Sequence, residues 1–403
     1  MDRGAHAVSH DKRNGPLIGI VAGEPSGQLL AADLIAALNA RLGTPVRLVG
    51  VGGPPLQTHG LASLFDPDEI ALMGLTSVVR ALPRLARRIG QTANALIAAR
   101  PDCLIVVDSP DFSLRVAKRV KKRLPDLPVV KYVAPTVWAW RPGRAPAMRA
   151  HVDHVLSILP FEPAVMAELG GPETHYVGHR LMADDALQRC WDANTARTAR
   201  ADGSTVNLLL LPGSRRSEVR ALLDDFRQAV DIMRERGNAL SITLPTLPHL
   251  ERQVRDHVLG WPDVVRVTTG RDAQIEAYGT ADVAIAASGT VLLELALAGV
   301  PAISCYRSDP LIRRVAERLL TTWSAALPNL IADRVVINEY YDEMIRPGML
   351  ARLAEELADP AGSRRATVMA GYHTVRDRMQ VNEPPSSKAA AIVADILEGH
   401  SRA

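Results

Sequence analysis

Short apolar runs alternate with longer segments of helical periodicity along most of this chain, and small or polar residues separate the two. Residues 103–107 are wholly apolar, which is typical of a strand buried on both faces of a parallel sheet. The same rhythm restarts at residue 207. We therefore predict an α/β fold. The predicted strands span residues 17–22, 45–51, 103–107, 129–133, 155–159, 175–177, 207–211, 241–244, 264–268, 283–287 and 302–305.

A polar segment rich in Ala, Asp and Arg interrupts this rhythm between residues 182 and 205 and predicts a connection between domains. Two successive halves of similar pattern indicate two Rossmann-like domains facing across a cleft. The predicted division is a disordered tail (1–15), an N-terminal domain (16–185), a linker (186–205) and a C-terminal domain that includes the last helices (206–403).

Residues 281–301 combine a predicted buried strand, a Ser288-Gly289-Thr290 turn and a helix whose one charged residue is Glu294. A helix that follows such a turn presents unpaired backbone N–H groups and the positive end of its dipole, which together favour an anion. A nucleotide diphosphate would fit there, with Glu294 reaching sugar hydroxyls. An ordinary crossover with Ser288 as the helix N-cap gives the same pattern, so the stretch alone leaves both interpretations open.

Polar residues also follow other predicted strands. Asp108 and Asp111 come directly after residues 103–107, where α/β enzymes place their chemistry, and either carboxylate could act as a general base while the other caps the helix. Arg215 follows the strand at 207–211, and its planar guanidinium suits a diphosphate.

His175 and His179 lie on a strand-to-loop segment and would not share a helical face, so we predict no metal site there.

Composition narrows the range of partners. Aromatic residues make up 4% of the 403 residues, which argues against stacked recognition of single-stranded nucleic acid. The net charge is only +3, but residues 80–149 contain fifteen Lys and Arg against four Asp, so this region suits phosphates, an anionic membrane surface or a solvated helical face. Residues 71–89 mix apolar residues with arginines and predict either a membrane-surface element or a core-facing helix.

The three cysteines are odd in number and far apart, as expected of buried thiols in a reducing compartment. No secretory signal or transmembrane helix is apparent, so a cytoplasmic location is expected. The sequence shows no P-loop, no GxGxxG, no GxSxG and no HExxH.

Nine ordered segments resemble the lipid-A-disaccharide synthase family, and the strings VWAWR and LPGSR are the most specific of them. The segments are GEPSGQ (23–28), MGL (73–75), DSPDF (108–112), YVAPTVWAWR (132–141), LPFEP (159–163), GH (178–179), LPGSRRSE (211–218), ASGTVLLELALAGVP (287–301) and LPNLIADR (327–334).

The resemblance implies a GT-B glycosyltransferase that joins UDP-2,3-diacylglucosamine to 2,3-diacylglucosamine 1-phosphate with inversion and releases UDP. It implies no cofactor and no metal, because Arg and helix-end charge stabilise the departing diphosphate. It also implies a peripheral enzyme on an anionic membrane surface, at the inner face of the inner membrane, and a possible homo-oligomer.

Site residues carried over by motif fall into three groups. Asp111, with Asp108 beside it, matches the candidate base. The donor side comprises Arg215, Ser288, Gly289, Thr290, Glu294, Asn329 and Glu339, and the acceptor side Glu24, Ser26, Trp138, Arg141 and His179.

The chain departs from the family pattern at Gln28, where Asp is usual. This change keeps open a non-catalytic paralogue that binds sugar nucleotides or lipid. Another GT-B enzyme acting on a UDP-amino sugar also stays open, and loss of acyl-chain dependence would support it.

Overall fold

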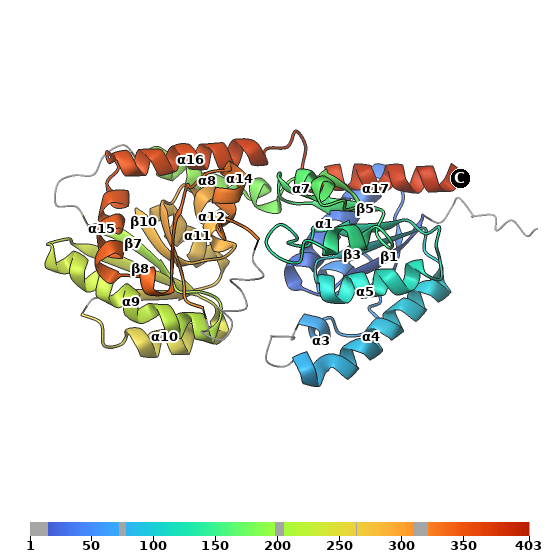
Figure 1. Cartoon of the computed structure of the whole chain (residues 1–403), viewed down its shortest axis with the longest axis horizontal. Helices are drawn as coiled ribbons and strands as arrows, with labels where there is room; N and C mark the ends of the chain where they lie inside the picture. Colours follow the sequence, from blue (N-terminus) through green and yellow to red (C-terminus); the bar gives the residue numbers. More distant parts are fainter. Residues whose placement is uncertain (1–14, 72–77, 198–204, 263, 309–320, 403) are drawn as a thin grey trace, which may run out of the picture. The chain divides into compact units, whose positions relative to one another are not determined.

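The computed structural model describes residues 15–71, 78–197, 205–262, 264–308 and 321–402. The chain forms two compact units, each with its own sheet. Unit 1 comprises Met1–Gly178 together with Val381–Ala403, and unit 2 comprises His179–Gln380. Figure 1 shows helices flanking the sheet of each unit, as expected of α/β layers.

Unit 1 is built on a six-stranded parallel sheet of order β2-β1-β3-β4-β5-β6. Its strands are β1 (Leu17–Ala22), β2 (Arg47–Val51), β3 (Cys103–Val107), β4 (Val129–Tyr132), β5 (His154–Ser157) and β6 (Glu173–Tyr176). Its described helices are α1 (Pro25–Leu42), α2 (Pro54–Gln57), α3 (Asp68–Ala71), α4 (Val78–Ala99), α5 (Pro110–Lys121), α6 (Arg144–Met148), α7 (Glu162–Glu168) and α17 (Pro385–Arg402).

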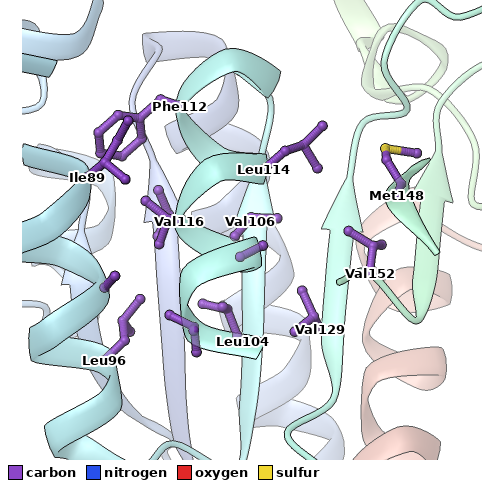
Figure 2. Packing of buried hydrophobic residues seen from close by; sticks show 14 of the residues in the cluster. Ile89, Leu96, Leu104, Val106, Phe112, Leu114, Val116, Val129, Met148 and Val152 are labelled. Carbon is purple, nitrogen blue, oxygen red and sulfur yellow. The ribbon is translucent and has the colours of Figure 1, made fainter. Parts of the chain in front are cut away.

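Alternate residues of each strand in this sheet face opposite helical layers. Leu104 and Val106 of β3 pack with Ile89 of α4 and Val116 of α5, as Figure 2 shows. Ile105, which lies between them in β3, belongs to a different cluster of buried residues, and α1 and α17 cover that cluster. Both faces are therefore buried, which explains why β3 is wholly apolar.

Unit 2 has a second six-stranded parallel sheet, of order β12-β11-β10-β7-β8-β9. Its strands are β7 (Val206–Leu211), β8 (Leu240–Thr246), β9 (Val265–Thr269), β10 (Val283–Ala287), β11 (Ala302–Tyr306) and β12 (Asn338–Tyr341). Its described helices are η1 (Arg180–Ala183), α8 (Asp185–Thr195), α9 (Arg216–Glu235), η2 (Pro248–Leu250), α10 (Glu251–Val258), α11 (Arg271–Thr280), α12 (Val291–Ala298), α14 (Leu327–Ala332), η3 (Asp342–Met344), α15 (Pro347–Ala358) and α16 (Ser363–Met379).

Each sheet has one point where the direction of strand succession reverses. In unit 1 it lies between β1 and β3, and in unit 2 between β7 and β10. Loops at the carboxyl ends of such strands diverge and leave room for ligands. In unit 1 the candidate site is therefore formed by the segments that follow residues 22 and 107, at this switch point of the sheet. In unit 2 it is formed by the segments that follow residues 211 and 287.

The structure corrects the predicted domain division in two places. The linker was predicted at 186–205, but its first ten residues belong to α8. Leu187, Cys190 and Trp191 of this helix bury an apolar face in unit 2. The last helix, α17, lies beside α1 in unit 1 rather than in the C-terminal domain (Figure 1), because residues such as Val393 complete the core over α1. Among the described residues, no helix is long and apolar enough to cross a membrane.

Candidate active site

Glu24 and Ser109 connect the two loops at the switch point of unit 1. Ser109 Oγ donates to Glu24 Oε1 over 3.0 Å, and Asp108 Oδ1 accepts the Ser109 amide at 2.8 Å. Burial and the nearby Asp108 carboxylate raise the pKa of Glu24, while Ser109 and Lys131 oppose that rise. Asp108 and Ser109 both have left-handed backbones, with φ of 46° and 37°. Two such residues in succession store backbone strain of the kind that occurs at functional sites.

Lys131 lies beneath this turn and was not predicted as a site residue. Its side chain is fully buried, and its Nζ donates to the Asp108 carbonyl at 2.5 Å. The same carbonyl also accepts from Ser113 Oγ at 2.7 Å. Burial lowers the pKa of Lys131 to about 7, although the carboxylates of Asp108 and Glu24 act in the opposite direction. A lysine in an otherwise apolar strand is the sequence signal that could have identified it.

Asp111, in the first turn of α5, is the more exposed of the two aspartates predicted as candidate bases. Its side chain is 61% exposed, and Oδ1 accepts from Arg144 Nη2 at 2.9 Å. The guanidinium of Arg144 lies 5.8 Å from the centre of the Trp140 ring, and that of Arg141 lies 4.1 Å from it. Trp140 of the WAWR segment therefore lies against the guanidinium that pairs with Asp111.

The other predicted acceptor-side residues of unit 1 have distinct environments. Ser26 is exposed in the first turn of α1. Trp138 is half-buried, packs edge-on against Phe161 and donates from Nε1 to Glu162 at 3.4 Å. Burial raises the pKa of Glu162 to about 8. Trp138 is thus anchored within unit 1 by a buried carboxyl group.

Gln28, the departure from the family pattern, has a structural role. It is 5% exposed, and its Nε2 donates to the Gly23 carbonyl at 3.0 Å. A Cβ on Gly53 would lie 2.2 Å from Gln28 Oε1, so the amide packs directly on that backbone. Gln28 therefore joins the loops after β1 and β2 and forms part of the lining of a hollow of about 820 Å³ beside them.

In unit 2, Arg215 lies at the N-cap of α9, directly after β7. Glu218 accepts from the amides of Ser214 and Arg215, and its Oε1 accepts from Arg215 Nη1 at 2.7 Å. The Arg215 side chain is 75% exposed. Gly213 has a φ of 115°, and a Cβ there would meet Glu218 Oε2 at 2.4 Å. The turn therefore requires glycine and leaves Arg215 at the surface beside β10.

Ser288, Gly289 and Thr290 form the turn between β10 and α12 that the sequence predicted. Ser288 is half-buried, while Gly289 and Thr290 are exposed. The Ser288 amide donates to Cys305 at 2.9 Å, whereas within the described chain the amides of Gly289, Thr290 and Val291 donate to no protein acceptor. Three N–H groups at a helix start remain available for an anion.

Glu294 is held by a network that the sequence did not predict. Its Oε2 accepts from Arg271 Nη1 at 2.8 Å and from the Tyr278 hydroxyl at 3.0 Å, and Arg271 also donates to Asp184 at 2.9 Å. Among described residues, Oε1 of Glu294 has no hydrogen-bond partner. One oxygen is therefore fixed, and the other can accept a hydroxyl.

Asn329, a predicted donor-side residue, is enclosed within unit 2. It is 1% exposed and exhausts its hydrogen-bonding capacity within unit 2, accepting from the amides of Val336 and Ile337 at 2.8 Å each and donating to Glu339 at 3.1 Å. Its side chain thus holds the turn between α14 and β12 together from within. Glu339 is half-buried and also bonds to Ser324, so Asn329 acts by positioning Glu339.

His179, predicted on the acceptor side, is the first residue of unit 2. Its Nδ1 accepts from the Leu181 amide at 3.1 Å, and burial lowers its pKa to about 4.

His175 lies in β6, where Glu173 is 3.6 Å from it and 3.4 Å from His154. In the part of the chain that is described, this trio is the one arrangement of side chains that could hold a metal ion.

Known proteins match this chain along nearly its whole length, across both sheets. A family model described as lipid-A-disaccharide synthetase matches residues 18–393. The lipid-A-disaccharide synthase of Nitrobacter winogradskyi is 43% identical over 380 residues, which cover 94% of this chain and 95% of that protein.

Two solved structures show the same fold. MurG of Acinetobacter baumannii matches with a TM-score of 0.57 at 15% identity, over 96% of this chain and 99% of its own. The glycotransferase of kitacinnamycin matches with a TM-score of 0.59 at 15% identity, over 95% and 100%. The predicted GT-B fold of two Rossmann-like domains is therefore confirmed.

Proposed function

The chain belongs to the lipid-A-disaccharide synthetase family and is a glycosyltransferase of lipid A disaccharide synthesis, and from this premise we propose its reaction in full. The donor is UDP-2,3-diacylglucosamine and the acceptor is 2,3-diacylglucosamine 1-phosphate. The acceptor 6-hydroxyl oxygen bonds to the anomeric carbon of the donor as the bond from that carbon to the diphosphate oxygen breaks. The configuration inverts, and UDP leaves.

Unit 2 binds the donor in this proposal. The amides of Gly289, Thr290 and Val291 at the start of α12 and the exposed guanidinium of Arg215 suit a diphosphate, because both supply positive charge to oxygens that gain negative charge as UDP departs. The unpartnered oxygen of Glu294 suits a ribose or sugar hydroxyl.

Unit 1 supplies the base. Asp111 has an exposed carboxylate whose orientation Arg144 fixes, whereas Asp108 uses its side chain within the turn. The observation that supports the assignment is this difference in accessibility. Asp111 takes the proton of the 6-hydroxyl as the new glycosidic bond forms.

We also propose that unit 1 docks on anionic lipid headgroups at the cytoplasmic face of the inner membrane. A groove between α4 and α5 has an apolar wall that includes Ile89 and Ile97, with Arg119, Lys122 and Arg123 among its cationic residues. Apolar side chains flanked by cations favour a membrane surface. Residues 72–77 of the predicted element at 71–89, with the MGL string in them, lie outside the described residues.

Turnover with the two acylated substrates tests the reaction, with UDP release and disaccharide measured together. Asp111→Asn is expected to lower kcat about a hundredfold or more. UDP-N-acetylglucosamine without acyl chains serves as the alternative donor. Preference for that donor would favour another amino-sugar transferase, and absence of turnover with either would favour the non-catalytic alternative.

The diphosphate assignment has its own test in UDP binding measured by calorimetry. Arg215→Ala should weaken UDP binding about tenfold, because a charged hydrogen bond is lost. Arg216→Ala is the matched control, since Arg216 is also exposed and is the next residue in the chain. Equal effects of the two substitutions would contradict the role of Arg215.

A further inference from the structure

A small hollow lies beside Asp111 in unit 1. Its volume is about 200 Å³. Pockets that enclose a drug-sized ligand measure roughly 300–1,000 Å³, so this one suits a single charged group rather than a whole acylated sugar. Its lining comes from α5, α6 and the segment after α6: Pro110, Asp111, Leu114, Arg115, Lys118, Arg144, Ala147, Met148 and His151.

The polar lining is strongly cationic. Arg115, Lys118 and Arg144 contribute three positive charges, and Asp111 contributes the one negative charge. Asp111 uses only Nη2 of Arg144, so the guanidinium retains donors for another anion. Such a set of Arg and Lys donors favours a phosphate group.

His151 provides a second, independent observation. It is 8% exposed, it lines the hollow, and its Nδ1 has no hydrogen-bond partner among the described residues. Buried polar atoms normally have a partner, so an orphaned one at a pocket wall indicates a ligand. The apolar wall is shared by Leu114 and Met148, which Figure 2 shows on α5 and at the end of α6.

The spacing along α5 relates this hollow to the reaction. Arg115 and Lys118 follow Asp111 by four and seven residues, so all three share one helix face. At 1.5 Å per residue, the two cations lie about 6 and 10 Å along the axis from the base. In 2,3-diacylglucosamine 1-phosphate, the phosphate is on C1 and the 6-hydroxyl is on the C6 arm of C5, the two carbons that flank the ring oxygen. A single ring can therefore bridge from Asp111 to these cations.

We propose that this hollow binds the 1-phosphate of the acceptor through Arg115, Lys118, Arg144 and His151. The inference rests on the proposed function, because it takes that acceptor as the substrate. The site holds the phosphate at one end of α5 and thereby directs the 6-hydroxyl to Asp111 at the other. It selects an acceptor with a free phosphate monoester over the same sugar without one.

The test measures steady-state kinetics of the full chain in detergent micelles, with 2,3-diacylglucosamine 1-phosphate and with unphosphorylated 2,3-diacylglucosamine as acceptors. Arg115→Ala and Lys118→Ala should each raise the KM for the phosphorylated acceptor about tenfold, as expected when a charged hydrogen bond is lost. The donor KM, and kcat/KM for the unphosphorylated acceptor, should change less than twofold. Arg149→Ala is the matched control, because Arg149 is exposed just after α6 and lines neither this hollow nor the α4–α5 groove.

Three results would overturn the proposal, and each has a different meaning. An unchanged acceptor KM in both Arg115→Ala and Lys118→Ala, with a normal wild-type rate, removes the phosphate site and leaves the proposed function intact. If, in addition, these variants lose binding to phosphatidylglycerol vesicles, the two cations bind lipid headgroup phosphate in the α4–α5 groove, which they also line, rather than the acceptor phosphate. A wild-type chain that forms no disaccharide with either acceptor overturns the proposed function itself.

Discussion

Replacing Lys131 with Met tests how the buried lysine supports the Asp108 turn. Lys131 is fully buried, and burial lowers its pKa from 10.5 to about 7. In the unfolded chain the same side chain is solvated and regains its ordinary pKa. Between these values the unfolded state binds a proton that the folded state does not. The free energy of unfolding of unit 1 must therefore rise with pH across that window.

The magnitude follows from the two pKa values. Each pH unit well inside the window adds about 1.4 kcal/mol, and the gain is smaller near pH 7, where the folded lysine is still half protonated. Integrated from pH 7 to pH 9, the contribution is about 2 kcal/mol. Lys131→Met has no proton to bind, so the difference in stability between the two proteins should change by that amount. Other titrating groups are common to both and cancel.

Urea unfolding at pH 7, 8 and 9 measures this difference, with the transition of unit 1 assigned by hydrogen exchange of peptides from β3 and β4. Lys122→Met is the surface control, because Lys122 is exposed, and its pH profile should match the wild type. Parallel profiles for the wild type and Lys131→Met would refute the argument. Lys131→Met should also lower kcat, because the Asp108 carbonyl loses its ammonium donor at the start of the helix that carries Asp111.

Three further substitutions test other parts of the structure. Gln28→Ala should lower the free energy of unfolding by about 1–3 kcal/mol, measured by urea unfolding, because the buried Gly23 carbonyl loses its donor, while UDP affinity stays constant. Glu162→Gln should flatten the pH dependence of the free energy of unfolding between pH 4.5 and 8. Burial raises the pKa of Glu162 in the folded state to about 8. The wild type therefore loses roughly 1.4 kcal/mol of stability per pH unit as pH rises through this range. Asn329→Ala should destabilise unit 2 by roughly 3 kcal/mol in the same assay, since two buried amides lose their acceptor; a smaller effect on stability than on UDP affinity would indicate direct ligand contact.

The parallel strands were the most predictable part of the fold. Residues 103–107 and 283–287 were predicted with the bounds that the structure has, because both strands are buried on both faces and are apolar throughout. The strand β12 (Asn338–Tyr341) was missed. It forms the edge of its sheet, and its sequence, two polar residues followed by two tyrosines, contains no aliphatic residue, so its apolar pattern is too weak to recognise.

The candidate site was predictable only where chemistry follows a strand in sequence. Asp111 and Ser288 could be proposed because each lies in the segment that follows an apolar strand. Arg144 and Arg271 were not, since each pairs with a carboxylate more than twenty residues away in sequence. Asn329 was assigned by motif alone, and the motif could not reveal that its side chain is enclosed by the amides of residues 336–337.

The return of α17 to unit 1 has a consequence for synthesis of the chain. Residues 179–380 are contiguous, so unit 2 has all of its sequence once residue 380 has left the ribosome. Unit 1 must wait for the last twenty-three residues, because Ala389, Val393 and Leu397 complete the core that α1 shares. Until then the nascent chain leaves apolar surface of α1 uncovered. The half of the enzyme translated first is thus the half completed last, and its exposed apolar surface is open to aggregation until the C-terminal helix folds onto it.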